Sequence, residues 1–567
     1  MTESVRIGNA SGFYGDRFSA VAEMLEGGRL DYLTGDYLAE LTMLILGRDR
    51  LKDPSRGYAK TFLRQMESNL GLAVDKGVKV VVNAGGLNPH GLAVALRELA
   101  EKLGVDARIA FVNGDDLMSR TEELGLGNPL TANAYLGAFG IKTGLDTGAD
   151  VVVTGRVTDA SLVVGCAASS FGWGPSDLDA LAGGVVAGHV IECGAQATGG
   201  NYSFFTDIPM GHLGFPIAEV AADGSSVITK HEGTGGAVTV GTVTAQLLYE
   251  VGGPRYLNPD ATPRLDTIAL EQVGPDRVSV SGVVGEAPPN TLKVSLNKLA
   301  GIRNQVEVVL TGLDVEAKAE LFKEQFTAAL PVQPAELDWE LVRHDRPDSP
   351  NEEQASALLR CVARDSDPAK VGRPFSAAAV ELALASYPGF HLTAPPGNGS
   401  PFGVFEPGYV DAALVEHRVV TPDGVSVVIP PSPLRTAPTA DSDDPAPATV
   451  TDWGPTHDAP LGELVGARSG DKGGSANIGL WVTDDEQFAW LDETLSVEKF
   501  TELLPETAGL RVHRYRLPNL RAVNFVVEGI LGRGVADQVR FDPQAKGLGE
   551  WIRSRVVPVP DRFVRSK

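Results

Sequence analysis

The stretch VKVVVNAGGLNPHG, residues 78–91, joins an apolar run to a polar loop with two adjacent glycines. The stretch VVVTGRVTDAS, residues 151–161, likewise joins an apolar run to a polar loop, here with one glycine. A run that is apolar at successive positions is typical of a strand buried on both faces, because a strand with one face in water would alternate. The two stretches therefore predict central strands of a parallel sheet, each leading into a loop and a helix.

Three further apolar runs, at residues 5–8, 30–33 and 108–112, precede the loops NASGFYGD, TGDYLAE and NGDD. Five such units in succession favour an α/β fold with a mostly parallel sheet and helices on both faces. We expect this region to cover residues 1–215.

The pattern changes after residue 215. The segment IAEVAADGSSVITKH places two alternating runs around Asp223-Gly224, which is a strong hairpin signal. Strand-like runs follow at 277–283, 291–296 and 306–312, and helical patterns follow at 314–330 and 351–364. We expect a mixed α/β region over residues 216–430, packed on the first.

The last part of the chain begins with a segment rich in Pro, Ala and Asp, at residues 431–458, which predicts a semi-extended linker. The order of patterns after it, ββαββα, predicts a small α+β domain over residues 459–567.

Composition excludes several partners. The 567 residues contain 49 Lys and Arg against 73 Asp and Glu, for a net charge of −24. Such a surface repels nucleic acid and anionic lipid, so we expect neither a nucleic-acid nor a membrane partner. Three cysteines are too few for a disulfide framework, and no apolar stretch is long enough to span a bilayer. We expect a cytoplasmic protein and, from the frequency of symmetric assemblies, a homo-oligomer.

Polar residues follow the predicted strands at the places where ligands bind in open parallel sheets. We interpret Asn9, Asp36, Asn83 and Arg156 as substrate-binding residues and Asp159 as catalytic. Helix capping is the alternative for any one of them, but as a group they favour a site.

The segment HVIECGAQATGGNY, residues 189–202, supplies a second set. A glutamate beside an apolar helix can have its pKa raised into the range of a general acid, so Glu192 is a catalytic candidate. Thr198 and Asn201 are substrate-binding candidates. Cys193 is either a reactive thiol or a small core residue, and the sequence leaves both open.

The segment HEGTGG, residues 231–236, opens a helical run. His231 and Glu232 form a candidate acid/base pair, and Gly235 belongs to a loop whose N–H groups can hold an anion. A surface turn is the alternative.

The segment GARSGDKGGSANIG, residues 466–479, lies between two predicted strands. We expect Arg468, Ser469, Lys472 and Asn477 to recognise the anionic end of a substrate or a partner. A solvated hairpin tip is the alternative.

Taken together, GNASGFYGDR at residue 8, NAGGLNP, TGRVTDAS, ECGAQATGGNY, HEGTGG and GARSGDKGGSANIG resemble the acyclic terpene utilisation protein A (AtuA) family over essentially the whole chain. The resemblance implies a large N-terminal region joined to a small ferredoxin-like domain. It also implies a role in the catabolism of branched isoprenoid acids as CoA thioesters, beside acyl-CoA carboxylases and enoyl-CoA hydratases.

Three functions remain open. The first is a hydratase- or lyase-type enzyme that acts on a branched acyl-CoA or related carboxylate by acid/base chemistry, with CoA entering as part of the substrate and no separate cofactor. The second is a non-catalytic subunit or scaffold of an acyl-CoA carboxylase or hydratase system. The third is a metal-dependent hydrolase, for which the sequence assigns no metal ligand.

Overall fold

The computed structural model describes residues 4–447 and 451–563. The chain forms two compact units. The first comprises Met1–Asn297, Phe405–Val535 and Asp542–Lys567, and the second comprises Lys298–Val404 and Ala536–Phe541.

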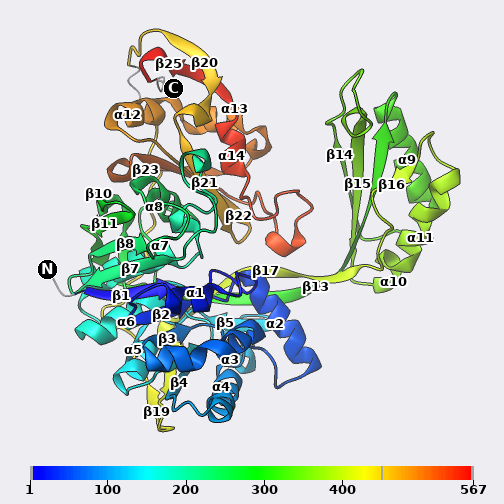
Figure 1. The fold of residues 1–567 in the computed structure, drawn as a ribbon. Coiled ribbons are helices and arrows are strands. Elements are labelled where there is room, and N and C mark those ends of the chain that lie inside the picture. The colour runs from blue at the N-terminus through cyan, green and yellow to red at the C-terminus, as the bar shows by residue number, and fades with distance from the viewer. Residues whose placement is uncertain (1–3, 448–450, 564–567) are drawn as a thin grey trace. The chain divides into compact units, whose positions relative to one another are not determined.

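A parallel core of five strands stands at the centre of the first unit, as the apolar runs predict (Figure 1). Residue pairs such as Gly8 with Leu33 and Val81 with Val152 set the register. The strands, in spatial order, are β1 (Ser4–Asn9), β2 (Tyr32–Gly35), β3 (Lys79–Val82), β6 (Val151–Thr154) and β4 (Ile109–Asn113). All four residues of β6 are buried, which confirms a strand covered on both faces.

Two clusters of buried apolar side chains cover the two faces of this core. Val81 and Val152 belong to one cluster, whereas their neighbours Val80 and Val153 belong to the other, because successive side chains of a strand point to opposite faces. The first cluster includes side chains of α5 (Phe139–Asp146), α6 (Ser161–Phe171), α7 (Leu178–Ile191) and α8 (Val240–Leu247). The second includes side chains of α1 (Ala20–Glu26), α3 (Lys60–Asp75) and α4 (Pro89–Leu103), while α2 (Glu40–Lys52) contributes to a small cluster of its own.

Antiparallel strands extend both edges of the core. The predicted hairpin around Asp223-Gly224 is present as β7 (Pro216–Ala221) and β8 (Ser226–Lys230). Because Ile217 of β7 pairs with Gly8 of β1, the expected division between residues 215 and 216 falls inside one continuous sheet. The remaining flanking strands are β10 (Ala269–Gly274), β11 (Arg277–Ser281), β18 (Arg418–Val420) and β19 (Ser426–Val428), and a separate pair is formed by β9 (Thr262–Arg264) and β12 (Val284–Glu286).

The long strand β13 (Thr291–Thr311) joins the two runs that the sequence predicts separately. Its first residues pair with β5 (Thr131–Ala134) in the first unit. In the second unit its later residues pair with β15 (Ser356–Asp365) and β16 (His391–Leu392), and β14 (Glu336–Val342) pairs with β15. The unit also contains α9 (Val315–Ala329), α10 (Pro368–Val371), α11 (Arg373–Glu381) and part of β17 (Ser400–Asp411).

The prediction of a helix at residues 351–364 was wrong. Residues 356–365 form strand β15, which pairs along its length with β13 on one side and with β14 on the other. Ladder hydrogen bonds and burial between two strands outweigh the local pattern, because strand preference depends strongly on the neighbouring strands.

The C-terminal part is the expected small α+β domain. Its four-stranded antiparallel sheet has the order β21 (Gly466–Lys472), β22 (Ser475–Trp481), β24 (Ala522–Val527), β23 (Val512–Leu517), and β20 (Thr456–Pro460) pairs with β25 (Val556–Pro560). Three helices, α12 (Asp485–Thr494), α13 (Val497–Leu503) and α14 (Leu548–Arg553), complete it.

The segment expected as a linker, 431–458, has neither helix nor strand in its described residues before β20. Its aspartates anchor it at intervals: Asp441 pairs with Arg255 at 2.7 Å, and Asp444 accepts a hydrogen bond from the backbone N–H of Arg516 at 3.0 Å. Residues 448–450 lie outside the described residues. The described part is therefore an irregular segment that an ion pair and a hydrogen bond hold in place. No helix in the described chain is both long and apolar enough to cross a bilayer.

Candidate functional site

The loops that follow β2 and β3 meet through two predicted residues. Asn83 Nδ2 donates a hydrogen bond to Asp36 Oδ1 at 2.5 Å, and Asn83 Oδ1 accepts one from the N–H of Tyr37 at 2.7 Å. Both side chains are buried. Burial, followed by the charge of Asp159, raises the pKa of Asp36 well above its ordinary value. The structure brings Asp36 and Asn83 together, and their mutual hydrogen bond ties the two loops.

Arg156 and Asp159 follow β6 and form an ion pair. Arg156 Nη2 donates to Asp159 Oδ1 at 2.5 Å, and Nη1 donates to the carbonyl of Leu38 at 2.9 Å. Asp115, in the loop after β4, accepts the backbone N–H of Arg156 at 2.9 Å. The Arg156 side chain is 4% exposed, whereas that of Asp159 is 32% exposed. A buried arginine therefore holds a carboxylate that remains accessible.

Glu192 lies at the end of α7 beside His189. Glu192 Oε1 lies 3.0 Å from His189 Nδ1, while Glu192 Oε2 is buried and has no hydrogen-bond partner among the described residues. Burial and the charges of Asp159 and Glu250 raise the pKa of Glu192 well above its ordinary value, and burial lowers the pKa of His189 to about 4. Burial thus favours the protonated form of the Glu192 carboxyl and the neutral form of the His189 imidazole.

The side chain of Asn9, a predicted substrate-binding residue, is engaged in hydrogen bonds to the backbone. Its amide donates to the carbonyls of Ile191 at 2.7 Å and Glu192 at 3.0 Å, and also to that of Ser11 at 3.0 Å. Asn9 therefore fixes the end of α7 on which Glu192 is carried.

A second group of charges lies near these residues. Glu40 Oε1 and Lys293 Nζ are 3.5 Å apart, and Lys472 Nζ lies 3.2 Å from the carbonyl oxygen of Glu250. Burial raises the pKa values of Glu40 and Glu250. Burial, followed by the charge of Lys293, lowers the pKa of Lys472 to about 8, although the Lys472 side chain keeps accessible surface. Part of this second group of charges is therefore open to solvent, since Lys472 is exposed.

The segment expected as a loop, 466–479, is a hairpin of β21 and β22 that turns at Gly473-Gly474. It packs against the residues after α8: Asn477 donates to the carbonyl of Leu248 at 2.7 Å and accepts the N–H of Glu250 at 2.9 Å. The C-terminal domain thereby positions Glu250.

Three further predicted residues, Asn201, Arg468 and Ser469, line one cavity of about 240 Å³. Ser469 Oγ donates to the carbonyl of Lys546 at 3.2 Å and accepts the N–H of Gly549 at 2.9 Å. Thr198 has a structural contact, because its hydroxyl donates to the carbonyl of Gly214 at 2.6 Å.

His231 and Glu232 lie apart from these groups. His231 Nε2 contacts the carbonyl of Met24 at 3.0 Å, and the ring lies against Gly27 and Gly28 at the end of α1. Burial lowers the pKa of His231, and Glu232 is exposed. Among the described residues, no contact joins either side chain to Asp159, Arg156 or Glu192.

Gly235, expected in the substrate loop, is packed against backbone. A Cβ at this position would lie 1.6 Å from the carbonyl oxygen of Gly211. We therefore expect Gly235→Ala to destabilise the fold by about 1–3 kcal/mol, measured as a lowered Tm. Gly211→Ala is the matched control, because nothing lies within 4 Å of its Cβ. A Gly235→Ala protein with the wild-type Tm would contradict the packing argument.

Several charged residues near the site had no sequence signal strong enough to single them out. Glu250 ends a helical run, Glu40 begins α2, and Lys293 lies within the strand-like run TLKVSL. Of these three residues, only Lys293 had a distinctive sequence context, because it is a lysine within an alternating apolar strand.

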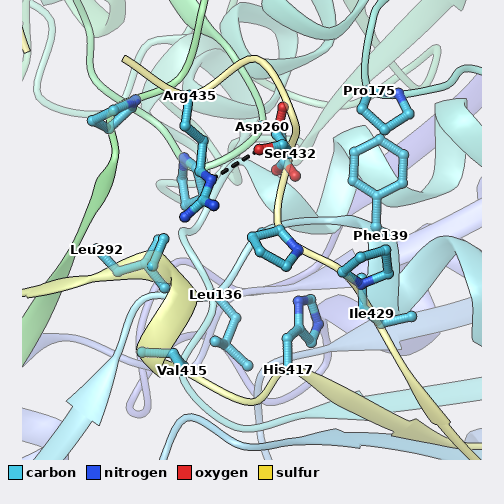
Figure 2. A pocket seen from close by; sticks show the side chains of 16 residues that line it. Leu136, Phe139, Pro175, Asp260, Leu292, Val415, His417, Ile429, Ser432 and Arg435 are labelled. Atoms are coloured by element: carbon cyan, nitrogen blue, oxygen red, sulfur yellow. Dashed lines mark hydrogen bonds between the residues drawn. The ribbon is translucent and has the colours of Figure 1, made fainter. Parts of the chain in front are cut away.

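A separate cavity of about 50 Å³ is lined mainly by apolar side chains and prolines (Figure 2). Asp260 and His417 reach it, and Arg435 Nε donates to the carbonyl of Ser432 at 2.8 Å. Burial raises the pKa of Asp260 to about 6 and lowers that of His417 to about 4. No predicted site residue lines this cavity. Within residues 4–447 and 451–563, no three His, Cys, Asp or Glu side chains are grouped to hold a metal ion.

These features define an α/β protein in which a small α+β domain packs beside charged loops at the carboxyl ends of a parallel sheet. The chain belongs to the acyclic terpene utilisation family: the family model described as acyclic terpene utilisation family protein AtuA matches residues 5–421. The model of the AtuA ferredoxin-like domain matches residues 459–558. These matches confirm the resemblance noted in the sequence. The comparison with curated proteins gives no match.

Proposed function

We propose that this protein is a hydratase- or lyase-type enzyme that acts on a branched acyl thioester, such as an acyl-CoA, or a related carboxylate. The proposal rests on one observation, the environment of the Glu192 carboxyl group. Burial raises its pKa and so favours its protonated form, and its Oε2 is buried without a hydrogen-bond partner in the described chain. A buried polar atom without a partner is costly, so a substrate atom that accepts its proton would relieve that cost.

Two carboxyl groups in different environments are the requirement for this chemistry. Glu192 is buried and raised in pKa, whereas Asp159 is accessible and accepts a hydrogen bond from Arg156. Glu192 is therefore the general acid, and Asp159 is the general base.

The proposed step is the addition of water to a carbon–carbon double bond next to the thioester. The water oxygen bonds to the β-carbon while Asp159 takes its proton, and Glu192 gives its proton to the α-carbon. The net change is one water added, and exchange with solvent restores both carboxyl groups. Dehydration is the same sequence reversed.

Membership in the acyclic terpene utilisation family supports a branched substrate. Aromatic surfaces lie beside the second group of charges, because the Lys293 ammonium lies 5.0 Å from the ring centroid of Tyr135 and 5.3 Å from that of Phe405. Such rings offer apolar contact area for a branched chain.

The test is incubation of the purified full-length protein with a panel of branched enoyl- and 3-hydroxyacyl-CoA thioesters in heavy-oxygen water. We expect an enoyl substrate to gain one water that carries the solvent oxygen and a 3-hydroxyacyl substrate to lose one water, and mass spectrometry detects both changes. The heat-denatured protein is the control. Absence of turnover across the whole panel would contradict the proposal and favour a non-catalytic subunit or scaffold of an acyl-CoA carboxylase or hydratase system.

A further inference from the structure

Among the described residues, four arginines are buried: Arg156, Arg360, Arg468 and Arg514. Three of them pair with a carboxylate. Arg156 pairs with Asp159, Arg360 with Glu340, and Arg514 with Asp492.

Arg468 is the exception. It is 5% exposed, its Nη2 donates to Gln196 Oε1, and its guanidinium lies 4.1 Å from the ring centroid of Tyr249. No carboxylate lies within ion-pair distance of it in the described chain, and its other N–H groups make no hydrogen bond there. A buried charge without a counter-charge lowers stability. The chain has an excess of acidic residues, with a net charge of −24, and yet none of them pairs with Arg468 in the described residues.

The cavity of about 240 Å³ places a second cation beside Arg468. Lys546 lines the same cavity, is exposed, and has no ion-pair partner among the described residues. Glu550 is the only acidic residue in the lining, and Arg553 already holds it through contacts of 2.7 and 2.8 Å. The lining of this cavity is therefore net positive.

Two nearby carboxyl groups, those of Asp471 and Glu250, have raised pKa values and so offset less of this positive charge than ordinary carboxylates would. Burial raises the pKa of Asp471 to about 8, and burial also raises the pKa of Glu250. A carboxyl group with a raised pKa retains its proton to higher pH and carries less negative charge than an ordinary carboxyl group at the same pH. The two cations are left to attract an external anion.

We propose that this cavity binds a phosphate or carboxylate group at the anionic end of the substrate, through Arg468 and Lys546. The guanidinium offers a fork of donors to an oxyanion, and the ammonium adds a compact charge. That the anion belongs to the substrate rests on the proposed function. Nothing in the sequence pattern pointed to Lys546, which the fold brings to the cavity from the segment before α14.

The experiment is isothermal titration of the full-length protein with three probes: inorganic phosphate, pyrophosphate and acetate. Tighter binding of phosphate or pyrophosphate than of acetate identifies a phosphorylated end, and the reverse order identifies a carboxylate end. We expect Lys546→Ala and Arg468→Gln each to raise Kd about tenfold or more. Added salt should weaken binding by the wild type more than by Lys546→Ala.

Lys499→Ala is the matched control, because Lys499 is a surface lysine that pairs with Glu502 at 2.9 Å. Its Kd should stay within about twofold of wild type. Failure of all three probes to bind, or wild-type binding by Lys546→Ala, would overturn the proposal. Because Lys546 is exposed, that variant decides the matter even if Arg468→Gln does not fold.

The outcome is separable from the proposed chemistry. Glu192→Gln should bind the same probe as tightly as wild type, because Glu192 does not line this cavity. Retained anion binding without turnover in the wild type would reject the chemistry alone, whereas turnover without anion binding would reject the cavity alone.

Discussion

Glu192→Gln should lower turnover by about 100-fold or more, because glutamine keeps the shape of the side chain but cannot donate a proton as an acid. The partner of the pair, His189, stays neutral in the variant, since burial holds its pKa at about 4. The fold should therefore persist, as circular dichroism and Tm would show. The measurement is the initial rate on the best substrate from the thioester panel.

The pH profile gives an independent readout of the same residue. Burial raises the pKa of Glu192, so its acid form persists to a higher pH than that of an ordinary carboxyl group, and the rate should fall as pH rises through that raised pKa. The Glu192→Gln variant should lose this alkaline limb.

Two other predicted catalytic residues serve as controls for the Glu192 variant. Their positions lead us to expect that His231→Ala and Glu232→Gln stay within about threefold of the wild-type rate, whereas a general acid or base there would cost about 100-fold. A fully active Glu192→Gln enzyme would remove Glu192 from the mechanism, and a strong loss in either control would restore the sequence-based assignment.

Arg514→Ala should produce the largest loss of stability. Arg514 is buried in the C-terminal domain, where its guanidinium pairs with Asp492 at 2.7 Å and donates to the carbonyls of Leu495 and Asp444 at 2.8 Å. Removing it leaves buried acceptors without donors, so we expect a loss on the order of 3 kcal/mol. Urea unfolding followed by tryptophan fluorescence measures the change.

Arg516→Ala is the control, since Arg516 pairs with the same Asp492 at 2.6 Å but is 39% exposed. Exposed pairs contribute little, so its loss should be under about 1 kcal/mol. Equal losses in the two variants would show that burial of Arg514 is not the cause.

Much of the fold was predictable because its signals are local. Apolar runs at 78–82 and 151–153 predicted central parallel strands, and Asp223-Gly224 predicted the hairpin. The prediction of a helix at 351–364 was wrong, because residues 356–365 become a strand through their pairing with β13 and β14, which come from other parts of the chain.

The site divides in the same way. Polar loops gather at the carboxyl ends of parallel strands, and this rule was enough to predict from the sequence that four residues lie near one another: Asp36, Asn83, Arg156 and Asp159. It did not distinguish residues that face a substrate from residues that satisfy backbone groups. Asn9 and Asn477 bind main-chain carbonyls, which no motif reveals.

The sequence suggested a raised pKa for Glu192, but it did not indicate the cause of that shift, the uncompensated charge of Arg468 or the position of Lys546. Each depends on burial and on the distance between groups that are far apart in the chain, as in the contact of Arg468 with Gln196 and Tyr249. Side-chain periodicity depends only on the order of neighbouring residues, so it can be determined from the sequence. Desolvation and charge pairing are properties of the space in which distant segments meet, so they arise only when the chain has folded.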